Sequence, residues 1–326
     1  MSGEIAGGWG GLVQNGKTAD PRKTFGAAVT AAARKNPAIV ALSADSGGSS
    51  GLGDFKKEFP DRYYEFGIME QGVVGIAAGL AATGKIPVFC AIAPFVTSRP
   101  FEMFRNDLGY MRQNVKIVGR NGGISYSDLG STHHSLEDFA IIRMIPGVTI
   151  LAPEDPGEIE GAVEAMLALK GPVYTRIGND PIPELFERRP FQIGKGRVVR
   201  PGKDVTVVVT GAMAGNVLGA AEILAARGVD AEVLAMPTVW PLDGALILES
   251  RAKTGRVVTV EEHYVTGGLG TMVQELTAEN NPAPVKKLGI PHGYASSGPY
   301  KELLAYYGLD GESIAASIAD FVRAFP

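Results

Sequence analysis

A single carboxylate stands at the start of an apolar stretch in the first quarter of the chain. Glu70 follows Met69 in "EFGIMEQGVVGIAAGLAATG", residues 65–84, where most positions after the glutamate are apolar or glycine. An unpaired carboxylate in such surroundings is costly, so we expect Glu70 to be paired, protonated or catalytic. An apolar environment raises a carboxyl pKa, which suits general acid–base chemistry near neutral pH. A structural carboxylate near a helix N-terminus would contribute only ~0.3 to 1 kcal/mol.

Two further sets of side chains have the chemistry of a functional site. His133 and His134 are adjacent on a glycine-bounded segment, and an imidazole can donate a hydrogen bond or carry a proton near neutral pH. Arg176 ends an expected strand, where open parallel sheets form ligand crevices, and a guanidinium binds phosphate through paired hydrogen bonds. A structural histidine and a solvated surface arginine are the alternatives, so residue types alone leave both possibilities open.

Composition is typical of a soluble globular protein that is long enough for two domains. The chain has 326 residues, 45% hydrophobic and 20% charged. Its formal net charge of -4 gives no reason to expect nucleic acid or a membrane surface as a partner. Cys90 is the only cysteine, which excludes an intramolecular disulfide. We find neither a leader sequence nor an apolar run of ~18 to 20 residues, and expect a cytoplasmic location.

Short apolar runs alternate with helical patterns, which favours right-handed βαβ units. The expected strands of the first half are continuous apolar runs, typical of parallel strands covered on both faces. They are residues 38–43, 87–92, 115–119, 148–151 and 173–177. The helices expected between them are residues 24–35, 71–83, 100–111 and 155–170.

A proline-rich segment separates the two halves of this pattern. "GNDPIPELFERRP", residues 178–190, has three prolines among charges, which indicates a linker. The alternation then restarts, with expected strands at 205–210, 231–235, 256–261 and 285–290, helices at 214–227 and 268–279, and a final amphipathic helix. The sequence therefore predicts an α/β fold of two doubly wound domains. Its expected parts are a flexible arm (1–20), a first domain (21–180), a linker (181–195) and a second domain (196–326).

The chain resembles thiamine diphosphate enzymes of the transketolase group from about Arg22 onward. The similar motifs include "RKTFGAAV", "LSADSGGSSG", "YYEFGIMEQGVVGIAAGLAATGKIPVF", "PFVTSRPFEMFRND", "STHHSLEDFAIIRMIPG", "PVYTRIG" and "VVTVEEHYVTGGLGTMV". The family's Gly-Asp-Gly with a distal asparagine, which holds the metal and the diphosphate, is not found. The chain therefore looks like the C-terminal subunit of a split transketolase, whose first domain binds the pyrimidine ring.

The resemblance implies a cofactor, thiamine diphosphate with Mg²⁺, and roles for three residues toward it. Glu70 matches the glutamate that hydrogen-bonds to the pyrimidine ring and promotes proton removal at the reactive carbon of the cofactor. Phe95 and Phe101 match positions that place aromatic faces on that ring, although plain core packing is nearly as good an interpretation for Phe101. No metal ligand is implied in this chain, because the partner subunit is expected to hold the diphosphate and the metal.

The resemblance also implies sugar phosphates as substrates, between which a two-carbon ketol unit is transferred. His133 matches the histidine that contacts the donor sugar and the reacting oxygen, and His134 would have at most a supporting role. Arg176 and Arg22 match arginines that bind the substrate phosphate, and Ser49 is a third candidate contact.

Two residues near the substrate, Leu129 and Asn121, depart from the usual pattern of the family, whereas Asp128 keeps the first acid of its acidic pair. Asp128 and Leu129 stand where transketolases have an acidic pair, and Asn121 stands where they have a phosphate-contacting histidine. All three are expected to face substrate, and losing a polar partner alters hydroxyl recognition. We therefore expect an unusual ketose, such as a branched, deoxy or sulfonated sugar.

The missing half of the enzyme implies a partner and an assembly. We expect an N-terminal transketolase subunit as partner, self-association through both domains, and a heterotetramer with active sites at subunit interfaces. Two alternatives remain open. One is the β subunit of a 2-oxo acid dehydrogenase E1 component, and the other is a non-catalytic interaction subunit.

Overall fold

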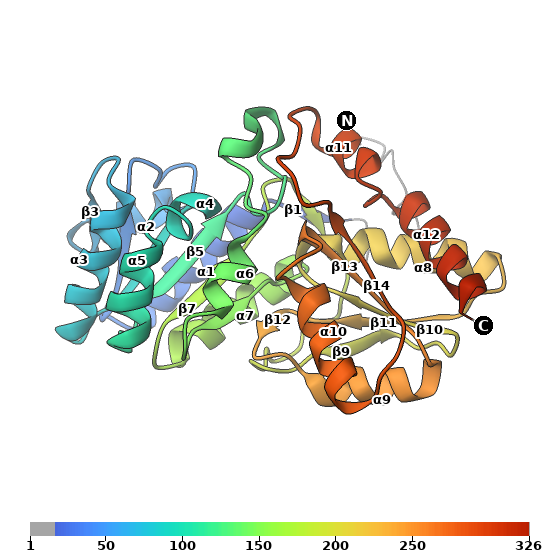
Figure 1. Ribbon diagram of the computed structural model, residues 1–326. Helices are drawn as coiled ribbons and strands as arrows, with labels where there is room; N and C mark the ends of the chain where they lie inside the picture. The colour runs from blue at the N-terminus through green and yellow to red at the C-terminus, as the bar shows by residue number, and fades with distance from the viewer. Residues whose placement is uncertain (1–16, 326) are drawn as a thin grey trace.

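The computed structural model describes residues 17–325 and has two lobes, each built on a β-sheet flanked by helices (Figure 1). The N-terminal lobe contains a seven-stranded sheet and the C-terminal lobe a five-stranded sheet. A small antiparallel sheet pairs β1 (Thr18–Ala19) with β8 (Ile182–Pro183). The α/β class predicted from the sequence is confirmed. Residues 1–16 of the predicted arm lie outside the described residues.

The sheet of the N-terminal lobe has the strand order β12-β6-β7-β5-β4-β2-β3, and every strand except β12 runs parallel to its neighbours. Its strands are β2 (Ile39–Ser43), β3 (Tyr63–Glu65), β4 (Ile86–Ile92), β5 (Lys116–Arg120), β6 (Thr149–Leu151), β7 (Val173–Arg176) and β12 (Thr238–Trp240). Most are buried on both faces, which is why they read as continuous apolar runs. The five strands predicted in the first half lie within one residue of those observed.

The helices of this lobe place four of the predicted site residues, Arg22, Glu70, Phe95 and Phe101. The helices are α1 (Pro21–Lys35), α2 (Gly53–Glu58), α3 (Glu70–Ala82), α4 (Ala93–Val96), α5 (Phe101–Met103), α6 (Asp138–Arg143) and α7 (Pro156–Ala168). The helix predicted at 100–111 is α5 followed by a π-helical segment, Phe104–Tyr110. The Asp20 carboxylate caps α1 by accepting the backbone N–H of Arg22 at 2.9 Å. α3 begins at Glu70, where the helix dipole favours a carboxylate.

The C-terminal lobe repeats the alternation of strands and helices. Its sheet has the order β14-β13-β10-β11-β9, with β9 antiparallel to β11. The strands are β9 (Arg197–Arg200), β10 (Val205–Val209), β11 (Ala231–Ala235), β13 (Val257–Tyr264) and β14 (Val285–Ile290). The helices are α8 (Ala214–Ala226), α9 (Gly244–Thr254), α10 (Leu269–Asn280), α11 (Tyr300–Tyr306) and α12 (Gly311–Ala324). The final helix, α12, buries its apolar face and packs against α8, as its amphipathic pattern predicts.

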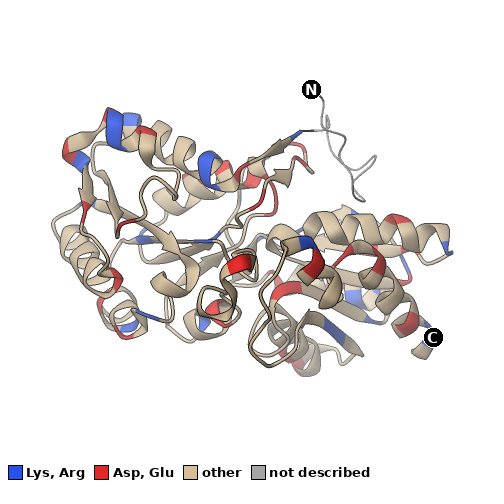
Figure 2. Ribbon diagram, turned by 90° about the horizontal axis from the view of Figure 1, so that it is seen from above, with Lys and Arg blue, Asp and Glu red and all other residues tan. Residues whose placement is uncertain are grey.

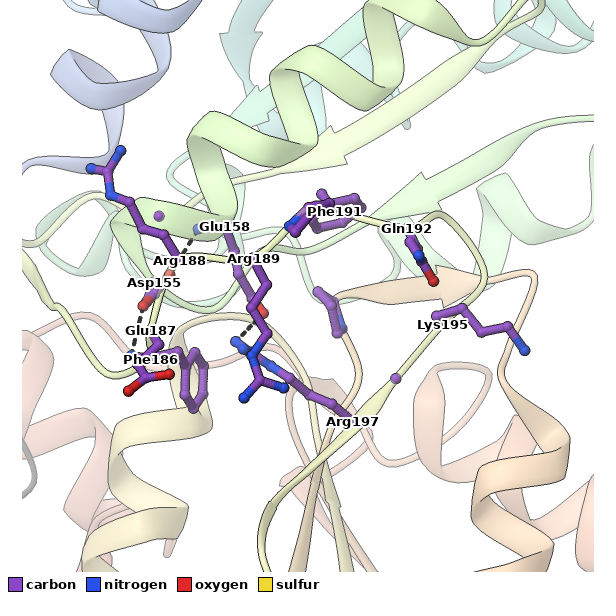
Figure 3. A pocket seen from close by; sticks show the side chains of 14 residues that line it. Asp155, Glu158, Phe186, Glu187, Arg188, Arg189, Phe191, Gln192, Lys195 and Arg197 are labelled. Atoms are coloured by element: carbon purple, nitrogen blue, oxygen red, sulfur yellow. Dashed lines mark hydrogen bonds and ion pairs between the residues drawn. The ribbon is translucent and has the colours of Figure 1, made fainter.

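Two features join the lobes. β12 comes from the C-terminal half of the chain but pairs antiparallel with β6 of the N-terminal sheet. The predicted linker contains β8 and borders a cavity of about 300 Å³, where Arg197 pairs with Glu158 (Figure 3). Acidic and basic positions are interspersed over both lobes (Figure 2). Among residues 17–325 no helix is long and apolar enough to span a membrane.

A buried network of polar groups also connects the lobes. The Arg176 guanidinium pairs with Asp138 at 3.0 Å and donates to the carbonyl oxygen of Glu262 at 2.7 Å. The Glu262 carboxylate accepts the backbone N–H of Ile124 at 2.7 Å and the hydroxyl of Tyr300 at 2.9 Å. Burial raises the pKa of Glu262 to about 7, although the positive charge of Arg176 opposes the shift.

We predict that Glu262 makes the stability of the subunit depend on pH. As pH rises from about 4.5 to about 7, the carboxyl ionises in the unfolded chain but stays protonated in the folded one. Its contribution to stability therefore falls over this window, by up to ~3 kcal/mol. The variant Glu262→Gln cannot ionise, so its melting temperature relative to the native subunit should rise across the same window. A difference in melting temperature that does not change with pH would contradict the assignment.

Candidate active site

Glu70 is paired, which answers the question raised by its apolar surroundings. Glu70 is only 5% exposed, and its carboxylate forms an ion pair with Arg99 at 2.7 Å. The Arg99 guanidinium also lies over the ring of Phe95, 3.8 Å from its centroid. Arg99 follows α4, and its side chain is 38% exposed, so it covers Glu70 from the solvent side. A buried carboxylate and an aromatic face therefore hold one flat cation between them.

His133 lies against the same aromatic ring. The ring centroids of Phe95 and His133 are 5.2 Å apart, and those of Tyr126 and His133 are 5.6 Å apart. The His133 Nδ1 atom is 2.9 Å from Thr132 Oγ1, which leaves Nε2 for another partner. Burial, with the nearby charge of Arg99, lowers the pKa of His133, so the imidazole is neutral at pH 7. Three predicted residues, Glu70, Phe95 and His133, are thus brought together.

The geometry around Glu70 suits a flat heteroaromatic ring. The position between the carboxylate and Phe95 accepts a planar group that donates hydrogen bonds, since the Arg99 guanidinium fills it in this structure. An aminopyrimidine is also planar and has ring nitrogens that can share a proton with a carboxyl group. The residues present therefore fit the pyrimidine half of thiamine diphosphate. In the described part of the chain, no cluster of three or more His, Cys, Asp or Glu side chains could hold a metal ion.

Two of the predicted substrate residues meet at an arginine that sequence reasoning missed. Arg120 ends β5, and its Nη2 donates to Ser49 Oγ at 2.8 Å. Its Nη1 donates to Asn121 Oδ1 at 2.7 Å and its Nε to Ser50 Oγ at 3.1 Å. The Asn121 backbone has a φ of 56°, a left-handed conformation that asparagine tolerates. Ser49 and Asn121 are therefore side-chain partners of one guanidinium.

The other predicted substrate residues lie on surrounding loops. Arg22 is half-buried and pairs with Asp20 at 2.9 Å, which raises its pKa. Asp128 and Leu129 are both exposed, Leu129 by 48%, on the short 3₁₀ segment Ser127–Thr132 that leads into His133. The apolar side chain of Leu129 thus faces solvent beside the candidate active site.

Arg176, Phe101 and His134 have other surroundings. Arg176 is buried, and its guanidinium pairs with Asp138 and donates to the backbone oxygen of Glu262. Phe101 is half-buried against the core that contains β2 and α3, so core packing accounts for its contacts. His134 is 3% exposed, and neither ring nitrogen has a hydrogen-bond partner among the described residues. These three predicted roles stay predictions.

None of Glu70, Phe95 or His133 lines the linker cavity of Figure 3.

Sequence reasoning missed Arg99, Arg120 and Tyr126. Arg99 follows Phe95 by four positions, a spacing that would stack the two side chains on a helix and was therefore a usable signal. Arg120 and Tyr126 carried no such signal, because their contacts depend on how loops that are far apart in the sequence pack together in the fold.

Comparison with known protein families covers most of the chain. Residues 17–180 match a family described as "Transketolase, pyrimidine binding domain". Residues 194–314 match one described as "Transketolase, C-terminal domain".

Several curated proteins are similar over nearly their whole length. The chain is 40% identical to one of the subunits of the apulose-4-phosphate transketolase of Phocaeicola vulgatus, over 93% of this chain and 97% of that protein. It is 39% identical to the 6-deoxy-6-sulfo-D-fructose transketolase subunit SqwH of a Clostridium species, over 86% and 88%. Among solved structures, a split gene transketolase described as an inactive beta4 tetramer superposes with a TM-score of 0.87 at 38% identity, covering 93% of this chain and 98% of the other.

Proposed function

Because this chain belongs to the transketolase family, we propose that it is the subunit of a two-chain transketolase that supplies the pyrimidine-binding and C-terminal domains. The resemblance inferred from the sequence motifs is confirmed by these matches. The reaction would transfer a two-carbon ketol unit between sugars. The observation that carries the proposal is that Glu70 and Phe95 both contact one planar group, the Arg99 guanidinium, and that His133 lies against the same Phe95 ring.

The residues around Glu70 would hold the pyrimidine ring of the cofactor. The Glu70 carboxyl would hydrogen-bond to a ring nitrogen and share a proton with it, and Phe95 would cover one face of the ring. Arg99 would turn away from Glu70 to make room, which its partly exposed position allows. Thiamine diphosphate, when bound, supplies the carbanion chemistry of the reaction.

His133 would act on the substrate. Its neutral ring has Nδ1 beside Thr132, so Nε2 is the atom available to hydrogen-bond to the donor sugar and to move a proton at its reacting oxygen. Phe95 and Tyr126 pack against the ring and restrict its orientation. A positioned, neutral histidine is suited to that proton transfer at pH 7.

The partner would be an N-terminal transketolase subunit that holds the diphosphate and Mg²⁺. Two relatives are named as one subunit of a transketolase, which supports a separate partner chain. The similar solved structure, a tetramer of beta chains, is described as inactive, which also supports the need for a partner. The assembly we propose has two copies of each subunit, with an active site at each interface between unlike chains.

The substrate would be a ketose other than the common pentose phosphates. Relatives are named for apulose 4-phosphate and for 6-deoxy-6-sulfo-D-fructose. In this chain Leu129 offers an exposed aliphatic side chain where the family resemblance places an acid, so it provides no acceptor for a sugar hydroxyl.

Reconstitution tests the function directly. The subunit, a partner from a neighbouring gene, thiamine diphosphate and Mg²⁺ would be assayed with phosphorylated and sulfonated ketoses and with aldehyde acceptors. We expect ketol transfer only when both subunits are present, and slow transfer from xylulose 5-phosphate to ribose 5-phosphate. Rates typical of an ordinary transketolase with that pair would contradict the unusual substrate. Oxidative decarboxylation of a 2-oxo acid would favour the β subunit of a 2-oxo acid dehydrogenase. No turnover with any combination of donor and acceptor would favour a non-catalytic interaction subunit.

A further inference from the structure

The linker between the lobes borders a cavity that the proposed function does not use. The cavity has a volume of about 300 Å³ and lies between the start of α7, the linker and the start of β9 (Figure 3). Small-molecule sites in proteins begin at about this volume. Most of the linker, residues 181–193, also falls between the two matched family domains, so neither family description accounts for it.

Basic side chains predominate in the linker part of this cavity. Residues 187–197, "ERRPFQIGKGR", contain four basic residues and one acidic residue, in a chain whose formal net charge is -4. All five line the cavity: Glu187, Arg188, Arg189, Lys195 and Arg197. Arg188 and Lys195 have acidic partners outside the cavity, Glu160 and Asp243. Arg189 is exposed and forms no ion pair with any residue of the described range 17–325.

The buried carboxylates in the wall already have partners within the protein. Asp155 accepts the backbone N–H groups of Glu158 at 2.8 Å and of Phe186 at 3.0 Å. Glu158 accepts the backbone N–H of Glu154 at 2.9 Å and a hydrogen bond from the guanidinium of Arg197. Burial also raises the pKa of Glu158, which reduces the negative charge that it presents near neutral pH. The wall therefore favours a negatively charged ligand.

Arg197 and Phe186 form a flat part of the wall in which one donor is left over. The Arg197 guanidinium lies over the Phe186 ring, 3.9 Å from its centroid. Within residues 17–325 its side chain makes one hydrogen bond, to Glu158, and its Nε is buried without a partner. A buried donor without an acceptor is costly, and an acceptor oxygen of a ligand would remove that cost. Figure 3 shows the Arg189 side chain extending from the linker toward this stacked pair.

We propose that the linker cavity binds an organic anion with a flat apolar body, held by the guanidinium groups of Arg189 and Arg197 beside the ring of Phe186. Guanidinium groups bind phosphate and carboxylate through charge-assisted hydrogen bonds, and an aromatic ring favours a planar partner. Because the wall comes from α7, the linker and β9, the bound anion connects the two lobes. The proposal does not depend on the transketolase activity, since the residues assigned to the reaction do not line this cavity.

Melting of the isolated subunit in the presence of simple aromatic anions tests the site. Phenyl phosphate, benzoate, inorganic phosphate and phenol would be added separately, at constant pH and at an ionic strength held constant with chloride. We expect phenyl phosphate or benzoate to raise the melting temperature in a saturable way, and more than inorganic phosphate or phenol does at the same concentration. No rise with either aromatic anion, or an equal rise with inorganic phosphate or with phenol, would overturn the proposal.

Substitutions show whether the anion binds at the linker. Arg189→Met removes an exposed side chain, so the subunit should fold, and the dissociation constant of the aromatic anion should rise roughly 10-fold. Phe186→Leu should weaken binding of the same anion by roughly 2- to 10-fold and leave the effect of inorganic phosphate unchanged. Arg105→Met, which removes an exposed arginine outside the cavity, is the matched control and should change neither. An anion that binds instead at the candidate active site gives a rise in melting temperature that Arg189→Met leaves undiminished, and that result would rule the linker site out.

Discussion

Replacing Glu70 with glutamine is expected to lower ketol transfer by the reconstituted enzyme by about 10²- to 10⁴-fold, the usual contribution of a positioned acid or base. Glutamine keeps the shape of the side chain and one acceptor oxygen but cannot share a proton with the pyrimidine ring. The subunit should remain folded, because Glu70 is paired only with Arg99, whose side chain is 38% exposed and can turn to water. The measurements are kcat at saturating substrate and the melting temperature of the subunit.

The matched control for this experiment is Glu102→Gln. Glu102 is an exposed glutamate on α5, so neutralising it should change neither kcat nor stability measurably. Retention of native kcat by Glu70→Gln, with the partner and cofactor present, would remove the central role assigned to this carboxylate. A large drop in melting temperature would instead indicate that the carboxylate mainly stabilises the fold.

Glu70 could be singled out from the sequence because its signal is local, whereas its role comes from the family resemblance and stays a prediction. A carboxylate followed by an apolar helical run is visible in neighbouring residues, and α3 begins at Glu70 itself. Arg120 is the last residue of the apolar strand β5, and its contacts with Ser49 and Ser50 join residues about seventy positions apart. A contact of that kind depends on the loop packing that follows sheet formation, so no local pattern shows it.

The same distinction explains which strands could be predicted. β2 and β5 are buried on both faces, so their continuous apolar runs identify them without knowledge of their partners. β12 has three residues and becomes a strand only because it reaches β6 of the other lobe. β9 is an edge strand with arginines at both ends, and the pattern of its residues does not distinguish it from a loop.

Replacing Asp138 with asparagine is expected to cost about 3 to 5 kcal/mol of folding free energy. Asp138 is fully buried and accepts hydrogen bonds from Tyr174 at 2.6 Å and from Arg176 at 3.0 Å. Neutralising it leaves the Arg176 cation buried without a counter-ion. The measurement is the free energy of unfolding of the isolated subunit in urea. Asp54→Asn is the matched control, because its ion pair with Lys57 is exposed and should contribute no more than ~1 kcal/mol.

A double mutant then separates a structural role of Arg176 from a role in phosphate binding. If the ion pair mainly stabilises the junction between the lobes, Arg176→Met should be as costly as Asp138→Asn, and the two together should cost less than their sum, because no lone charge remains buried. A methionine variant that keeps the native free energy of unfolding but loses affinity for phosphorylated sugars would contradict this. Arg176 would then bind the substrate, as the family resemblance predicts, and its pairing with Asp138 would belong only to the substrate-free subunit.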